Sequence, residues 1–174
     1  YLRKHAYANT VTSDLWEGLD GAADWPVGEI MDTWVNQKGF PQIDVRVVPE
    51  GIHLGQRRFL AIPDETDITI WDVPIQLRGV VGGEPFETKV LLTEDETVVP
   101  IDGPFDFVVA NAGGHGFYRT RYSDELFTGL LGHLDTLGDI ERHILVSDTW
   151  AMVRSAQVPA SAFLDLVGKF GKET

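Results

Sequence analysis

Residues 42–51 have the sequence QIDVRVVPEG, and this stretch decides the fold. Apolar side chains stand at every second position, Ile43, Val45 and Val47, with polar side chains between them. That two-residue period is typical of a strand with one buried face. The Pro-Glu-Gly that ends the stretch predicts a turn, so residues 52–60 are expected to return as the second strand of a hairpin.

Strand patterns continue from this hairpin to residue 122, with no helical segment between them. Further strands are expected at residues 68–71, 73–81, 87–92, 98–101, 105–110 and 117–122. Gly82 and Gly83 predict a two-residue hairpin turn. Short strands separated by turns favour a β-sandwich over a parallel α/β sheet. We therefore expect a complete antiparallel β-sandwich in the middle of the chain.

Helical periodicity occupies both ends of the chain. Helices are expected over residues 12–23, 26–39, 123–137 and 140–154, and from Pro159 onwards. Ser123 suits a helix N-cap, and Pro159 suits the start of the last helix. The expected fold class is therefore mixed α and β: a central antiparallel β-sandwich flanked by N-terminal and C-terminal α-helical segments.

The first five residues, YLRKH, predict the last turn of a helix, because their basic side chains suit a helix C-terminus. The sequence does not begin with Met. We interpret this beginning as a cut inside a larger protein.

The charge balance disfavours a nucleic-acid partner. The 174 residues carry 14 Lys and Arg against 27 Asp and Glu, a formal net charge of −13. Phosphate binding needs clustered basic side chains, which this composition lacks. The absence of cysteine excludes disulfides, thiolate zinc sites and cysteine nucleophiles, and favours a cytoplasmic location. No apolar run approaches the ~20 residues of a membrane span.

Histidine, glycine and serine patterns do not indicate a reaction centre. The five histidines are His5, His53, His115, His133 and His143, and none forms a pair at zinc-ligand spacing. The glycine-rich residues 113–116 lie between strands, with no helix or Lys to receive a phosphate, which favours a loop or tight turn. No G-x-S-x-G motif is present, and a triad could be drawn only arbitrarily from Ser123, Ser147, Ser155 or Ser161.

Two acidic clusters and the tryptophans also have structural interpretations. Asp64, Glu65 and Asp67, and then Glu94, Asp95 and Glu96, lack the spacing of a calcium loop and predict solvated turns. Trp16, Trp25, Trp34, Trp71 and Trp150 fall mostly on apolar faces, which favours core or interface packing.

Several motifs resemble the aminopeptidase N and puromycin-sensitive aminopeptidase family, in the family's order. Residues 1–16 resemble Y-L-x-K-x-x-Y-x-N-x-x-x-x-D-L-W, residues 31–41 M-D-T-W-x-x-Q-x-G-F-P, residues 56–59 Q-x-R-F, residues 71–75 W-x-V-P-I, residues 116–122 G-Y-Y-R-V-x-Y, and residues 147–156 D-D-x-F-A-L-A-R-A-G. Thr120, Trp150 and the pair Ser155-Ala156 depart from those patterns.

The resemblance implies part of a four-domain zinc enzyme. Residues 1–40 would be the last helices of the thermolysin-like catalytic domain, residues 41–122 the β-sandwich domain, and residues 123–174 the first helices of the helical C-terminal domain. The parent protein would remove N-terminal amino acids from peptides with a zinc-bound water. The family's amine-binding G-x-M-E-N and zinc-binding H-E-x-x-H motifs do not occur here, so we assign no catalytic, metal or substrate-binding residue.

The expected role of this segment is therefore that of a structural connector, inactive by itself and holding no zinc. The alternative is a stand-alone β-sandwich that acts as a binding or adaptor module. We further expect self-association through apolar faces exposed at the two helical ends.

Overall fold

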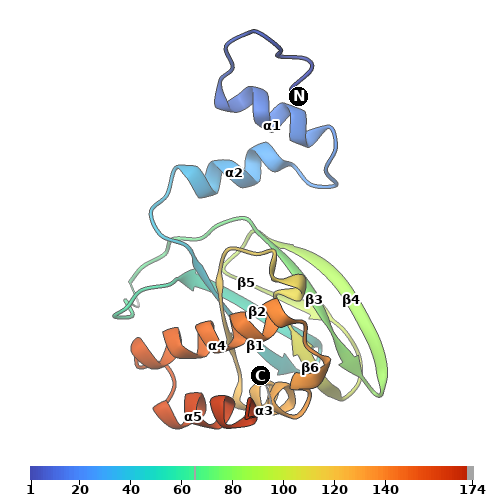
Figure 1. Ribbon diagram of the computed structural model, residues 1–174, viewed down its shortest axis with the longest axis vertical. Coiled ribbons are helices and arrows are strands. Elements are labelled where there is room, and N and C mark those ends of the chain that lie inside the picture. The colour runs from blue at the N-terminus through green and yellow to red at the C-terminus, as the bar shows by residue number, and fades with distance from the viewer. Residues whose placement is uncertain (65, 172–174) are drawn as a thin grey trace.

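The computed structural model describes residues 1–64 and 66–171. The elements, in chain order, are α1 (Thr12–Asp20), α2 (Val27–Val35), β1 (Pro41–Val48), β2 (Gly51–Arg58), β3 (Val73–Val81), β4 (Glu84–Leu92), β5 (Glu96–Pro100), β6 (Phe105–Val109), the 3₁₀ turn η1 (Ala112–Gly114), β7 (Arg119–Tyr122), α3 (Asp124–Gly132), the 3₁₀ turn η2 (Leu134–Thr136), α4 (Asp139–Arg154) and α5 (Ala160–Lys169). The strands lie between two helical groups, which confirms the expected mixed α and β class (Figure 1).

Two sheets build the centre of the molecule, with strand orders β5-β2-β1-β7 and β4-β3-β6. The predicted first hairpin is present, with Val45 opposite Leu54. The second hairpin joins β3 and β4 through Gly82 and Gly83, which both have positive φ angles. Glycine adopts positive φ angles without strain, and the predicted two-residue turn is confirmed.

One strand pair corrects the expectation of an antiparallel sandwich. β7 pairs with β1 in parallel, with Ile43 beside Thr120. β6 belongs to the other sheet, so the chain crosses between sheets before it enters β7. No hairpin turn links β7 to its neighbour, and its direction is therefore free of the antiparallel constraint that a tight turn imposes.

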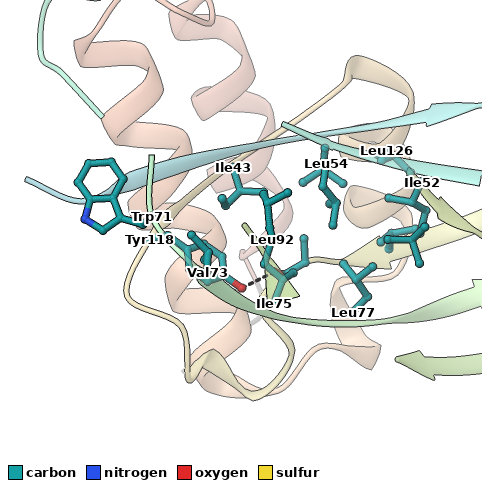
Figure 2. Packing of buried hydrophobic residues seen from close by; sticks show 14 residues of the cluster. Ile43, Ile52, Leu54, Trp71, Val73, Ile75, Leu77, Leu92, Tyr118 and Leu126 are labelled. Atoms are coloured by element: carbon teal, nitrogen blue, oxygen red, sulfur yellow. Dashed lines mark hydrogen bonds between the residues drawn. The ribbon is translucent and has the colours of Figure 1, made fainter. Parts of the chain in front are cut away.

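The main core lies between the two sheets. Ile43 and Leu54 from one sheet face Ile75 and Leu77 from the other, and all four side chains are fully buried (Figure 2). Leu126 of α3 completes the same cluster. The sandwich core therefore includes a side chain from the C-terminal helical group.

A second apolar cluster fixes α3, α4 and α5 against the outer face of β6. Its buried members are Phe107, Val109, Leu130, Leu137, Leu145 and Leu166. Gly129 makes the close approach of α3 possible, because a Cβ at that position would lie 2.5 Å from the carbonyl oxygen of Asp106. The C-terminal helices thus pack directly on the sheet.

The N-terminal helices extend from the other side of the molecule, with α1 in contact with α2 (Figure 1). No side chain of α1 is buried. The prediction that the first five residues form the last turn of a helix is wrong. These residues form turns, and the His5 N–H donates to the Tyr1 carbonyl at 3.2 Å.

The strand expected at residues 68–71 is also wrong. The segment has no regular secondary structure and joins neither sheet, and Ile68 is 92% exposed. Side chains replace the missing ladder: Gln56 accepts from the Trp71 N–H at 2.9 Å and donates to the Trp71 carbonyl at 2.8 Å.

Several element boundaries also differ from expectation: the helices expected over residues 12–23 and 26–39 end at Asp20 and Val35, and the strand expected at residues 87–92 begins at Glu84. β7 begins at Arg119 instead of Phe117, whose side chain is exposed. The helix expected over residues 123–137 ends at Gly132, and a 3₁₀ turn follows. The predicted cap at Ser123 is present and accepts from the Leu126 N–H at 3.4 Å.

Candidate functional site

Two joints connect the sandwich to its flanking helices, and side-chain hydrogen bonds hold both of them together. We call the attachment of α2 to residues 70–72 the N-terminal joint. We call the attachment of α4 to β3, η1 and β7 the C-terminal joint. Each joint is built from hydrogen bonds between residues far apart in sequence.

At the N-terminal joint, α2 is fixed to the chain just before β3. The indole N–H of Trp34 donates to the Asp72 carbonyl at 2.9 Å, and Thr33 Oγ1 accepts from the Asp72 N–H at 3.1 Å. One turn later, the Gln37 amide donates to the Ile70 carbonyl at 2.9 Å. These three bonds satisfy backbone groups that no strand partner reaches.

Aromatic rings support the same joint. Trp34 lies 6.2 Å from Trp71 and 6.4 Å from Phe117, measured between ring centroids. Phe40 continues the series with Phe117 at 5.4 Å and Phe59 at 5.5 Å. Aromatic pairs at such distances contribute roughly 0.5–1.5 kcal/mol each beyond their buried area.

Glu141 is the centre of the C-terminal joint. Its Oε1 accepts from Arg78 Nε at 2.8 Å and from the Gly113 N–H at 3.0 Å, while Oε2 accepts from the Gly138 N–H at 2.9 Å and from Arg78 Nη2. The Glu141 side chain is 6% exposed. One carboxylate therefore ties together β3, η1 and the start of α4.

The environment keeps Glu141 ionised. Burial acts to raise the pKa of its carboxyl, but Arg78 and the N–H groups of Gly113 and Gly138 outweigh it and lower the pKa from 4.5 to about 2. In turn, Glu141 raises the pKa of the Arg78 guanidinium. Glu141 and Arg78 therefore both stay charged near neutral pH.

Asp148 makes the second contact of this joint, two turns further along α4. Its Oδ2 accepts from the N–H and hydroxyl of Thr120 at 2.8 and 2.7 Å, and its Oδ1 accepts from Arg119 Nη1 at 2.8 Å. Arg119 also donates to Ser147 Oγ at 2.6 Å. Burial raises the pKa of Asp148, while Arg119 and Thr120 oppose that rise.

A third contact lies where α4 turns into α5. The side chains of Gln42 and Gln157 donate to each other's carbonyl oxygens, both at 2.9 Å. Arg57 also donates to Gln157, and pairs with Asp44 at 3.1 Å. Because Gln42 is on β1, this contact fixes the far end of α4 to the sheet that does not carry Arg78.

The motifs that carry the family resemblance meet at these joints. Thr33 and Trp34, of the M-D-T-W match, bind the backbone of Asp72 in the W-x-V-P-I match. Arg119, of the G-F-Y-R stretch, binds Ser147 and Asp148 of the last match. The sequence motifs therefore mark contact residues, although their pairing was not foreseen.

Glu141 and Arg78 were missed altogether by the sequence analysis. They lie 63 residues apart, and neither falls in a quoted motif. The glycine-rich residues 113–116 were the only sequence feature that pointed to this site. As expected, they form a tight turn. The Gly113 N–H donates to the carboxylate of Glu141, so the anion that this turn binds is a side chain of the same chain.

The histidines are dispersed over the molecule. His53 Nε2 lies 2.8 Å from a Glu96 oxygen, His133 Nδ1 lies 2.9 Å from the Gly129 carbonyl, and His115 and His143 are exposed. In the described ranges, no group of three or more His, Asp or Glu side chains is arranged to hold a metal ion. The donor set does not fit zinc, and we derive no step through that metal.

The acidic clusters, serines and tryptophans have structural contacts. Asp67 corrects the expectation of solvated turns, because its side chain is 7% exposed and pairs with Arg58. Glu65 lies outside the described residues. Ser155 Oγ donates to the Ala151 carbonyl at 3.0 Å within its own helix. Trp71 is buried as expected, whereas Trp150 is 48% exposed and lies 5.0 Å from Phe163.

Comparison with known proteins finds relatives that are named aminopeptidases. Residues 107–174 match the family model described as the ERAP1-like C-terminal domain. The chain is 33% identical to the puromycin-sensitive aminopeptidase of Caenorhabditis elegans, over 99% of this chain and 19% of that protein. It is 35% identical to aminopeptidase 2 of Candida albicans, over 100% of this chain and 19% of that protein.

An archaeal relative extends the comparison. The tricorn protease-interacting factor F2 of Thermoplasma volcanium is 28% identical over 98% of this chain and 20% of its own length. The chain thus spans about a fifth of the length of the curated relatives that it matches. Among the helices in the described ranges, none is both long enough and apolar enough to cross a membrane.

Proposed function

This chain is homologous over its whole length to the aminopeptidase N family, and from that premise we propose that it is the structural connector of a zinc-dependent aminopeptidase. In this proposal residues 1–40 close the catalytic domain, residues 41–122 form the sandwich domain, and residues 123–174 open the helical C-terminal domain. The connector sets the position of one flanking domain relative to the other.

The geometry of the two joints is the observation that supports this role. Motif residues at the N-terminal joint hold α2 on the sandwich, and motif residues at the C-terminal joint hold α4 on its other side. Hydrogen bonds have defined directions, and those of Arg119 at the C-terminal joint are charge-assisted, so they fix orientation as well as proximity. A segment built in this way suits the transfer of a fixed geometry between domains.

The chemistry belongs to other parts of the proposed parent. The relatives carry the name aminopeptidase, and such a parent would hydrolyse the N-terminal peptide bond of peptide substrates. In a zinc peptidase, the metal activates the attacking water. We propose that this segment contributes neither zinc ligands nor a catalytic residue, and that the parent acts in the cytoplasm.

The alternative of a stand-alone binding module is less well supported. Such a module would be expected to share only its sandwich with relatives. The alignments instead cover 99–100% of the chain, including the helices on both sides.

A chimeric enzyme tests the proposal. The corresponding region of the Caenorhabditis elegans puromycin-sensitive aminopeptidase would be replaced by residues 1–174, and hydrolysis of an aminoacyl-anilide would be measured together with the zinc content. A flexible linker of equal length in the same place serves as the control. The isolated 174-residue chain would be assayed in parallel.

The expected result is a zinc-containing, active chimera, an inactive linker protein, and an isolated chain with neither turnover nor stoichiometric zinc. Turnover by the purified isolated chain would overturn the connector role. A linker protein as active as the chimera would equally show that the segment fixes nothing that catalysis needs.

A further inference from the structure

A cavity with a mostly apolar lining lies at the N-terminal joint. Its volume is about 400 Å³. The lining residues are Ile30, Met31 and Trp34 of α2, Val73, Pro74 and Gln76 of β3, and Asn111, His115, Gly116, Phe117 and Tyr118 of the crossover. Ligand-binding cavities in proteins span roughly 300–1,000 Å³, so this cavity is large enough for a small organic molecule.

All three walls of the cavity are held in place by hydrogen bonds. The α2 wall is fixed by the Trp34 bond to Asp72 at 2.9 Å. The crossover wall is fixed by Asn111, whose side chain accepts from the Gly116 N–H at 2.8 Å and donates to the Gly116 carbonyl at 3.0 Å. β3 is a central strand of its sheet. A ligand would therefore lose little free energy to ordering of the site.

The lining is uncharged and aromatic. None of the residues around the cavity is Lys, Arg, Asp or Glu, and the chain as a whole has a net charge of −13. Trp34 and Phe117 present two ring systems with centroids 6.4 Å apart. An anion would find no Lys or Arg there, whereas a planar apolar ring can pack against the aromatic side chains.

One polar group offers a directional contact. The outward-facing Gln76 carries an amide for which no hydrogen bond to another described residue is found, unlike the amide of Asn111. A side-chain amide both donates and accepts. It could therefore pair with a hydroxyl or carbonyl on an otherwise apolar ligand.

We propose that this cavity is a binding site for an uncharged, planar aromatic molecule that carries one hydroxyl or carbonyl group. The ring would lie against Trp34 and Phe117, and its polar group would bond to Gln76. The site shares its α2 wall with the N-terminal joint, but it requires only the walls described above and not the connector role.

The test uses 2-naphthol as the probe and the whole 174-residue chain. Binding would be followed by two-dimensional NMR at the indole N–H of Trp34 and the amide of Gln76. 2-Naphthoate, which has the same rings but a negative charge, is the comparison ligand. We expect saturable binding of 2-naphthol with a dissociation constant below about 1 mM. The affinity for 2-naphthoate should be at least about tenfold lower.

Two substitutions locate the probe. Met31→Glu places a carboxylate in the α2 wall and should weaken 2-naphthol binding at least about tenfold. Val35→Glu, on the exposed side of the same helix, is the matched control and should leave the affinity unchanged. Gln76→Leu should remove the directional contact and weaken 2-naphthol binding several-fold, because one hydrogen bond to the ligand is lost.

Circular dichroism of each variant distinguishes loss of the site from loss of the fold, and Gln76→Leu tests the site if Met31→Glu disturbs α2. The proposal is overturned if 2-naphthol causes no saturable shift. It is also overturned if both cavity variants bind as the unsubstituted chain does, if 2-naphthoate binds equally well, or if the cavity proves to be covered by a second copy of the chain.

Discussion

Replacing Glu141 by Ala should destabilise the protein more than any single change at an exposed carboxylate. The substitution leaves the Arg78 guanidinium half-buried with only its 3.2 Å bond to the Thr136 carbonyl, and it leaves the N–H groups of Gly113 and Gly138 without their carboxylate. Removing one partner of a buried ion pair costs about 3–5 kcal/mol. We expect the free energy of unfolding to fall by that amount at pH 7.

The pH dependence gives an independent estimate of the same contact. The pKa of Glu141 is lowered from 4.5 to about 2 in the folded protein, which corresponds to about 3 kcal/mol. Because the folded-state pKa is the lower one, this stabilisation is complete above pH 4.5 and is lost as the pH falls through 2. Between pH 7 and pH 3, about 2 kcal/mol of it should disappear.

Urea unfolding followed by circular dichroism, at pH 7 and pH 3, measures both effects. Glu141→Gln keeps the shape of the side chain without its charge, so the difference between the two pH values should shrink by about 2 kcal/mol. Asp139→Asn, at a 93%-exposed carboxylate in the first turn of the same helix, is the control and should change stability by less than about 0.5 kcal/mol. If Glu141→Ala costs no more than this control, or if Glu141→Gln leaves the pH dependence intact, the joint does not have the strength assigned to it.

Three other outcomes follow from the same contacts. Asp148→Asn should lower the free energy of unfolding by about 1.5–3 kcal/mol in a urea titration, since one charge-assisted bond is lost; an unchanged midpoint would contradict the role of that carboxylate. Trp34→Phe should cost at least about 1 kcal/mol in the same assay, because it removes the N–H donor to Asp72 and part of the ring contact with Trp71 and Phe117, whereas no loss would contradict the role of Trp34 at the joint. Sedimentation over a tenfold concentration range should reveal self-association through the helical ends, where α1 buries no side chain; a strict monomer would refute that expectation.

The sequence predicted the sandwich well where the pattern is local. β1 and β2 follow from alternating apolar residues around one turn, and the β3–β4 turn follows from two glycines. These features depend on side chains within a few residues of each other. Their physical cause is therefore contained in the stretch that was read.

The predictions failed where a distant contact replaced a local rule. Residues 68–71 look like a strand, yet Gln56 and Gln37 satisfy the backbone that a neighbouring strand would otherwise bind. The parallel direction of β7 depends on the crossover between sheets, which no residue pattern specifies. Periodicity identifies an extended segment, but it does not identify its partner.

The joints were only partly predictable for the same reason. Arg119 and Asp148 each stood in a recognised motif, so their importance could be inferred but not their contact. Glu141 looked like an ordinary acidic residue in the first turn of a helix. Its burial depends on an arginine on a strand formed 63 residues earlier.

Native-state hydrogen exchange tests the central claim, that the sandwich and the C-terminal helices form one rigid connector, most directly. The amides of β6 and α4 should open with free energies within about 1 kcal/mol of each other, because the apolar cluster around Phe107 packs α4 against β6, while Glu141 binds Arg78 of the adjacent strand β3 and Asp148 binds Thr120 of β7. If the α4 amides exchange through an opening several kcal/mol easier than that of β6, the helices are loosely attached and the connector account is contradicted.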